Sequence, residues 1–108
     1  RRRHKALDEP LRSFEWLVVL DFEWTCDNRR RLEPGPEIIE FPSVLVQGQY
    51  PFNVVDEFQV YVKPEFNPRL TDFCRGLTGI TQAAVDAGVP LQRALDLHRR
   101  WLRSHGLV

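Results

Sequence analysis

A run of apolar residues that ends in two acids constrains this chain more than any other feature of its sequence. Residues 16–20 are Trp, Leu, Val, Val and Leu, and Asp21, Phe22 and Glu23 follow directly. A continuous Val- and Leu-rich run of this length is typical of a β-strand that is buried on both faces, in the middle of a sheet. Because side chains two positions apart on a strand point to the same side, we expect Asp21 and Glu23 to project together near the end of a strand at about 15–24.

The two carboxylates at Asp21 and Glu23 repel each other and lose hydration when a strand brings them together. A bound cation relieves both effects, and Mg²⁺ is often held by only one or two carboxylates together with phosphate oxygens of a substrate. The pair is equally compatible with a solvated strand end, with a cap on a neighbouring loop, or with an ion pair to an arginine. Three residues leave these alternatives open, so the rest of the chain has to decide between them.

The composition favours one small domain inside the cell. The 108 residues contain 15 Lys and Arg against 15 Asp and Glu, so no net charge draws the whole chain to nucleic acid or to a membrane. The longest apolar run is far shorter than a membrane span, and the basic start does not lead into the apolar core of a signal peptide. Cys26 and Cys74 lack the spacing of a metal or redox motif, which favours a reduced compartment, cytoplasmic or nuclear.

The expected elements are three strands followed by helices. Residues 1–13 are polar and predict a lead-in or linker, and the loop chemistry of 26–36 separates the first strand from a second strand at 37–47. We expect an irregularity at Pro42, because proline lacks the N–H that a strand ladder uses. A short turn then makes the third strand, at 54–63, an antiparallel hairpin partner of the second strand.

Three helical segments are expected after the strands. Thr71 is placed to cap a short helix at 72–76, a turn follows at 77–81, and a second short helix covers 82–87. A longer helix at 90–105 has an apolar stripe on one side and charged residues on the other. The expected stripe consists of Leu91, Ala94, Leu95, His98, Trp101 and Leu102. This order of elements is typical of the first half of an α/β or α+β domain.

Five short blocks of sequence carry a resemblance to a known family. The blocks are Leu20-Asp21-Phe22-Glu23 with Thr25-Cys26, Glu37-Ile38-Ile39-Glu40-Phe41-Pro42, Tyr61-Val62-Lys63-Pro64, Leu70-Thr71-Asp72-Phe73-Cys74 and Leu77-Thr78-Gly79-Ile80-Thr81-Gln82. In this order they resemble the DEDDh 3′→5′ exonucleases, and among them the ERI-1 / three-prime histone mRNA exonuclease group. The resemblance implies an α/β, ribonuclease H-like exonuclease fold, of which 14–108 is the N-terminal part with three strands, partly antiparallel, then short helices and one longer helix.

The resemblance also implies a site. Family members remove nucleotides from RNA or DNA 3′ ends with two Mg²⁺ or Mn²⁺ ions, and Asp21 and Glu23 match their first catalytic and metal-binding motif. The substrate-binding residues that the resemblance implies are Phe22, Trp24, Thr25, Leu77, Thr78 and Gly79. A stacking surface formed by such residues accepts any base. Trp24 stands where many relatives have Ala, and both a stacking role and core packing are compatible with it.

The matched blocks contain only one of the family's acidic motifs. The family also needs a second Asp on a later strand and a His and an Asp near a final helix, and we expect these beyond residue 108, since Asp96, His98 and His105 lie in the long helix and do not replace them. The resemblance therefore implies a metal-dependent 3′→5′ exonuclease acting on RNA or DNA ends, inactive as this segment alone. The alternative is a module of the same fold that binds nucleic-acid ends or a protein without cutting. No membrane partner is expected, and the sequence identifies no protein partner.

Overall fold

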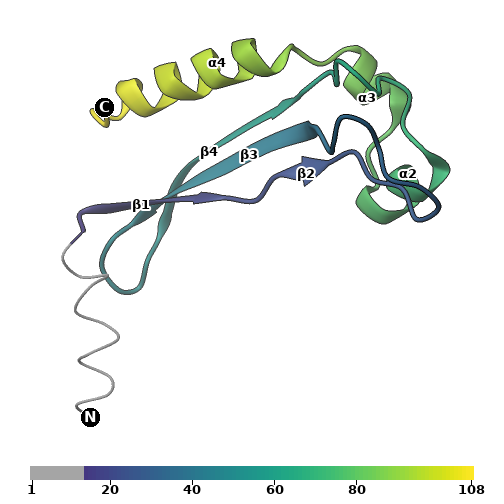
Figure 1. Ribbon diagram of the computed structural model, residues 1–108. Helices are drawn as coiled ribbons and strands as arrows, with labels where there is room; N and C mark the ends of the chain where they lie inside the picture. The colour runs from purple at the N-terminus through teal and green to yellow at the C-terminus, as the bar shows by residue number, and fades with distance from the viewer. Residues whose placement is uncertain (1–13) are drawn as a thin grey trace. The chain divides into compact units, whose positions relative to one another are not determined.

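The computed structural model describes residues 14–108, so the predicted lead-in at 1–13 lies outside the described residues. All described strands precede the helices, as the sequence predicts (Figure 1). The strands are β1 (Trp16–Leu20), β2 (Glu23–Trp24), β3 (Ile38–Gln47) and β4 (Val54–Tyr61), and the helices are α2 (Asp72–Thr78), α3 (Gln82–Asp86) and α4 (Leu91–Ser104). These residues group into two units, one with 14–20 and 43–57 and the other with 21–42 and 58–108.

In the first unit, β1 pairs antiparallel with residues 43–47 of β3 in continuous register. The turn that leaves β3 requires glycine at position 48, because a Cβ atom there would lie 2.0 Å from the carbonyl oxygen of Phe14. The N–H of Gly48 donates to the carbonyl oxygen of Glu15 at 2.8 Å. The start of β1 is therefore held directly against the turn between β3 and β4.

Among the described strands, β1 pairs with β3 alone, whereas its apolar sequence predicts a strand in the middle of a sheet. β3 pairs with β1, β2 and β4, whereas β1 pairs with β3 alone. Val18, Val19 and Leu20 are consequently 38%, 52% and 44% exposed. A continuous apolar run is typical of a strand that is covered on both faces, so the sequence of β1 predicts a covering that residues 14–108 do not supply.

The second unit begins where the first predicted strand is interrupted. Asp21 and Phe22 lie between β1 and β2, and the register of β1 places Asp21 opposite Pro42 of β3. Because Pro42 has no N–H to donate, the ladder loses a hydrogen bond at this point. β3 itself runs from Ile38 to Gln47 without a break, so the irregularity predicted at Pro42 falls on the neighbouring strand.

Threonine hydroxyls begin the two short helices. Thr71 caps α2 and Thr81 caps α3, each by accepting a hydrogen bond from the backbone N–H three residues further on. The prediction of a turn at 77–81 is wrong at its start, because Leu77 and Thr78 form the last residues of α2. Gly79 ends α2 with a φ of 75°, a left-handed conformation that glycine adopts without strain. In the described part of the chain, no helix has the length and apolar character needed to cross a membrane.

Two buried clusters hold the second unit together. The first cluster joins β3 to α2 and α3 and consists of Ile39, Leu70, Cys74, Ile80 and Val85. The second, here called the ring cluster, joins β3 to α4 and consists of Phe41, Val62 and Ala94 with the rings of Phe22, Phe58, His98 and Trp101 around them. The strands of this unit are therefore fixed by helices on the α2–α3 side and by aromatic rings under α4.

The ring cluster corrects the predicted apolar stripe of α4. Ala94 is fully buried, and His98 and Trp101 follow it at helical spacing. Leu91 and Leu95, in contrast, are 42% and 45% exposed. The helix contacts the sheet through a narrower strip than its sequence suggests, because the large rings of His98 and Trp101 occupy the interface.

The half-buried imidazole of His98 predicts a loss of stability in mild acid. Burial against Phe41 and Phe58, at ring-centroid distances of 4.9 and 5.2 Å, lowers the pKa of His98 below its ordinary value of 6.5. As the pH falls from that value toward the lowered pKa, the unfolded chain binds a proton that the folded chain does not, so the free energy of unfolding decreases. Urea unfolding at about pH 8 and about pH 5 measures this difference, which His98→Phe should reduce. An equal difference in the two chains would contradict the assignment.

Candidate functional site

Glu23 and its neighbour Phe22 point to opposite faces of the sheet. Glu23 lies directly opposite Glu40 of β3, which places these two side chains on one face. The ring of Phe22 packs edge-on against Phe41, the next residue of β3, with ring centroids 4.7 Å apart. Since consecutive residues of a strand face opposite sides, the carboxylate of Glu23 lies on the face away from the ring cluster.

Asp21 and Glu23 both keep their carboxylate oxygens available. Asp21 is exposed and Glu23 is half-buried, and neither side chain forms a hydrogen bond or ion pair with any residue between 14 and 108. Glu23 also faces the like charge of Glu40, an arrangement that is unfavourable without a counter-ion. The loop-capping and arginine-pairing alternatives therefore have no contact to support them in the described part of the chain.

The two carboxylates suit a hard divalent cation whose remaining coordination positions are filled by other ligands. Mg²⁺ takes oxygen ligands, and one or two carboxylates suffice when waters and phosphate oxygens fill the remaining positions. Asp21 and Glu23 supply that number. Over residues 14–108, no group of three or more His, Cys, Asp or Glu side chains is arranged to hold a metal by itself. The described residues thus offer two carboxylates to a metal and leave the other positions to water or substrate.

Glu40 lies opposite Glu23, a position that the sequence offered only as the weaker alternative to a solvent-facing carboxylate next to Pro42. It is half-buried, and its Oε2 accepts a hydrogen bond from Nε2 of Gln59 at 2.9 Å. Its place opposite Glu23 follows from the register between β2 and β3. The only local signal was the alternation of Ile39, Glu40 and Phe41, which indicates two faces but not the partner strand.

Trp24 and Thr25, two of the predicted substrate residues, have structural partners. Thr25 is buried, its Oγ1 accepts from the N–H of Glu37 at 2.9 Å, and its own N–H donates to the Glu37 carbonyl at 2.8 Å. Trp24 is 49% exposed, lies 6.2 Å from Phe22 between ring centroids, and lines a cavity of about 800 Å³ with residues 62–66 and the start of α4. No described contact turns either side chain toward the carboxylates, so their substrate roles stay predictions, as does that of Phe22.

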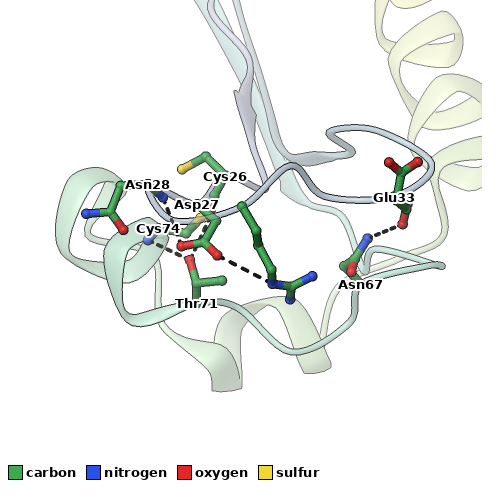
Figure 2. Close-up of polar contacts among 8 residues, drawn as sticks. Cys26, Asp27, Asn28, Glu33, Asn67, Thr71 and Cys74 are labelled. Atoms are coloured by element: carbon green, nitrogen blue, oxygen red, sulfur yellow. Dashed lines mark hydrogen bonds and ion pairs between the residues drawn. The ribbon is translucent and has the colours of Figure 1, made fainter.

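The first turn of α2 is bound to the segment that follows Glu23. Oγ1 of Thr71 donates to the carbonyl oxygen of Cys26 at 2.6 Å, and Sγ of Cys74 donates to the carbonyl oxygen of Trp24 at 3.5 Å. Figure 2 shows Thr71 and Cys74 beside Cys26, at the point where the loop after β2 passes the helix. α2 therefore begins next to the carboxylate-bearing segment.

The surroundings of Cys26 disfavour its thiolate form. Burial, the Cys74 thiol and the charges of Asp27 and Glu23 raise the pKa of Cys26 from 9.0 to about 11. A thiol with this pKa stays protonated at neutral pH and is a poor nucleophile. Both cysteines are free, with Cys74 buried and Cys26 half-buried.

The far end of α2 presents the predicted Leu77-Thr78-Gly79 segment. Leu77 is 68% exposed, and Phe73, four residues earlier on the same helix, is 38% exposed. Side chains four apart on a helix lie on one face, so Phe73 and Leu77 together form an apolar surface. Sequence reasoning missed Phe73 because it placed Leu77 in a turn, and the i, i+4 spacing carries meaning only within a helix.

Comparison with known proteins identifies relatives of this arrangement. The family model described as Exonuclease matches residues 18–108. Human ERI1 exoribonuclease 2 is 47% identical over 94 residues, which cover 84% of this chain and 13% of that protein. A crystal structure described as the nuclease domain of 3′hExo, a DEDDh family member, bound to rAMP matches with a TM-score of 0.81 at 39% identity, covering 87% of this chain and 46% of that chain. A structure described as 3′-end specific recognition of histone mRNA stem-loop by 3′-exonuclease matches with a TM-score of 0.80 at 38% identity.

The chain spans less than half of each of these solved structures, 46% and 41%, and 13% of the human relative. The matched range 18–108 nevertheless contains Asp21, Glu23 and the whole of α2. The carboxylate-bearing segment and the helix bound to it therefore lie within the part of the fold that is shared.

Proposed function

Because the chain belongs to the exonuclease family, we propose that it provides the carboxylate-bearing N-terminal part of a 3′→5′ exonuclease domain that acts on RNA 3′ ends, with DNA as the alternative substrate. Residues 14–108 form this part, and none of them matches the family's second or third motif. The observation that supports the proposal most strongly is the pair Asp21 and Glu23, whose oxygens are engaged by no residue in the described range although Glu23 faces the charge of Glu40.

Asp21 and Glu23 would hold Mg²⁺ or Mn²⁺, of which a complete site takes two. The ions, when bound, make a water more acidic and stabilise charge on the leaving 3′ oxygen. The chain itself contributes two carboxylates on a segment that α2 holds in place. His98 does not act as the missing histidine base in this proposal, since it packs against Phe41 on the face opposite to Glu23.

The terminal base of the nucleic acid is proposed to stack on the apolar surface of Phe73 and Leu77. An exposed apolar face of this kind stacks with any base and so suits an enzyme that removes successive nucleotides. Thr78 and Gly79, which end the same helix, would lie next to the 3′ end of the bound nucleic acid. The two solved relatives support a nucleotide ligand, since one is described with rAMP and the other with an RNA 3′ end.

A module that binds nucleic-acid ends or a protein without cutting is the second candidate. The observation that favours it is that, within residues 14–108, no group of three or more His, Cys, Asp or Glu side chains is arranged to hold a metal. An end-binding module predicts the same metal-dependent end binding as the enzyme and differs from it only in turnover by the complete domain, whereas a protein-binding module predicts no metal-dependent end binding.

The 108-residue chain itself tests the proposal. A single-stranded RNA labelled at its 5′ end is prepared with either a 3′-hydroxyl or a 3′-phosphate, and binding is followed by anisotropy during a Mn²⁺ titration. We expect tighter binding of the 3′-hydroxyl form only when Mn²⁺ is present, because the metal and the apolar surface together contact a free end. We expect no shortening of the RNA, because the chain supplies two of the required carboxylates and no base.

Equal affinity for both RNA ends, or binding that is indifferent to Mn²⁺, would contradict the proposed site. Steady release of nucleotides by this chain would show instead that the site is complete without further motifs. A single-stranded DNA of the same sequence, tested in parallel, distinguishes the two substrate classes.

A further inference from the structure

The hydroxyl of Thr71 forms two hydrogen bonds with different consequences. As an acceptor it caps α2, taking the N–H of Cys74 at 3.0 Å. As a donor it binds the carbonyl oxygen of Cys26 at 2.6 Å, which is not part of the helix. The same atom therefore defines where α2 begins and ties that beginning to the loop after β2.

Residues 24–26, the segment that Thr71 contacts, all form hydrogen bonds with neighbouring residues. Cys74 donates through Sγ to the carbonyl of Trp24 at 3.5 Å, and Thr25 exchanges two hydrogen bonds with Glu37. All three residues that follow Glu23 in the chain thus have a side-chain or backbone partner. The backbone position of Glu23 is consequently set from its C-terminal side by the first turn of α2 and by Glu37.

The opposite end of α2 is equally well defined. Oγ1 of Thr78 donates to the carbonyl of Cys74 at 2.8 Å and accepts from the N–H of Ile80 at 3.1 Å, and the N–H of Gly79 donates to the Arg75 carbonyl at 2.9 Å. The 7 residues of α2 span about 10 Å at 1.5 Å per residue. A short helix with both ends closed by hydrogen bonds acts as a rigid spacer.

We infer that Thr71 is a positioning residue that sets the separation between the carboxylates of Asp21 and Glu23 and the end-binding surface of Phe73 and Leu77. The inference rests on the proposed function. It adds how the carboxylates and the apolar surface are kept at a fixed distance from each other. The hydroxyl of Thr71 is occupied by Cys26 and Cys74, so Thr71 acts through its neighbours. Its donor bond to Cys26 keeps α2 at a fixed place beside the carboxylate-bearing segment.

The two roles of Thr71 are separated by matched substitutions. Thr71→Asp keeps a good N-cap acceptor but has no proton to donate to Cys26. Thr71→Val removes both bonds without adding charge, and Thr71→Ser keeps both. Thr81→Asp is the control, because Thr81 caps α3 through the N–H of Ala84 and has no second partner of this kind in the described residues.

The measured quantity is end discrimination, the ratio of affinities for RNA with a 3′-hydroxyl and with a 3′-phosphate in Mn²⁺. We expect Thr71→Asp and Thr71→Val to lower this ratio about tenfold, the scale of one lost hydrogen bond, with circular dichroism of Thr71→Asp unchanged. Thr71→Ser and Thr81→Asp should leave the ratio at the wild-type value. A residue that only stabilises the helix would not move the ratio in Thr71→Asp.

Two negative results have different meanings. If the wild-type chain does not discriminate between the RNA ends, the proposed function fails and the inference falls with it. If the wild-type chain discriminates and Thr71→Asp does so equally well, the proposed function stands and the inference is overturned. A loss in Thr71→Val alone would assign the effect to the helix cap and would also overturn it.

Discussion

A Glu23→Gln chain is expected to bind Mn²⁺ at least about tenfold more weakly than the wild-type chain, a loss of about 1.4 kcal/mol. The substitution keeps the size of the side chain but removes one of the two charges that would hold the ion. It also removes the repulsion between Glu23 and Glu40 across the β2–β3 pair, so the free energy of unfolding should stay the same or rise. Weaker binding combined with unchanged or greater stability is the signature of a cation ligand.

Asp21→Asn is expected to weaken Mn²⁺ binding to a similar extent, because its exposed carboxylate also has no partner between residues 14 and 108. Glu57→Gln is the control, since Glu57 is an exposed carboxylate of β4 in the other unit. Calorimetric Mn²⁺ titration measures the affinity, and urea unfolding measures the stability. If Glu23→Gln bound Mn²⁺ with wild-type affinity, or if it lost stability without losing Mn²⁺ affinity, Glu23 would have a structural role and would not be a metal ligand.

The carboxylate-bearing segment was predictable because its signal is local. Asp21 and Glu23 follow an apolar run that indicates a strand, and the blocks around them were sufficient to identify the exonuclease family, which the comparisons confirm. The ribonuclease H-like fold class is confirmed by the same solved relatives. The cap at Thr71 was also a local signal, since a hydroxyl before a helical segment satisfies an N–H group within three residues.

The remaining features depend on pairings that no local pattern contains. The pairing of β3 with β1, β2 and β4 is set by strand order, which no single strand's sequence contains. Glu40 enters the site only through its register with Glu23. Leu77 looks like a turn residue because glycine follows two positions later, yet α2 continues to Thr78 and uses Gly79 as its left-handed cap. Because the predicted helix ended too early, the sequence did not show that Phe73 and Leu77 share one face.

Phe41→Ala is expected to lower the free energy of unfolding by about 3–5 kcal/mol, the cost of truncating a large buried ring. Phe41 is 3% exposed, and its ring lies 4.7 Å from that of Phe22, 6.0 Å from Phe58 and 4.9 Å from His98, between centroids. The truncation removes the one ring that all three neighbours share and leaves a cavity under α4. Small domains are stable by only about 5–15 kcal/mol, so this is a large fraction of the total.

The same substitution should also disturb the carboxylates. Phe22 lies between Asp21 and Glu23 in the chain, and its ring packs against Phe41. We therefore expect Phe41→Ala to weaken Mn²⁺ binding even at urea concentrations where the chain remains folded. Tyr50→Ala is the control, because Tyr50 is 84% exposed and its removal should change stability by no more than about 0.5 kcal/mol. Urea unfolding followed by tryptophan fluorescence measures both chains. A loss in Phe41→Ala no greater than that in Tyr50→Ala would mean that the ring cluster does not hold the carboxylate-bearing segment in place.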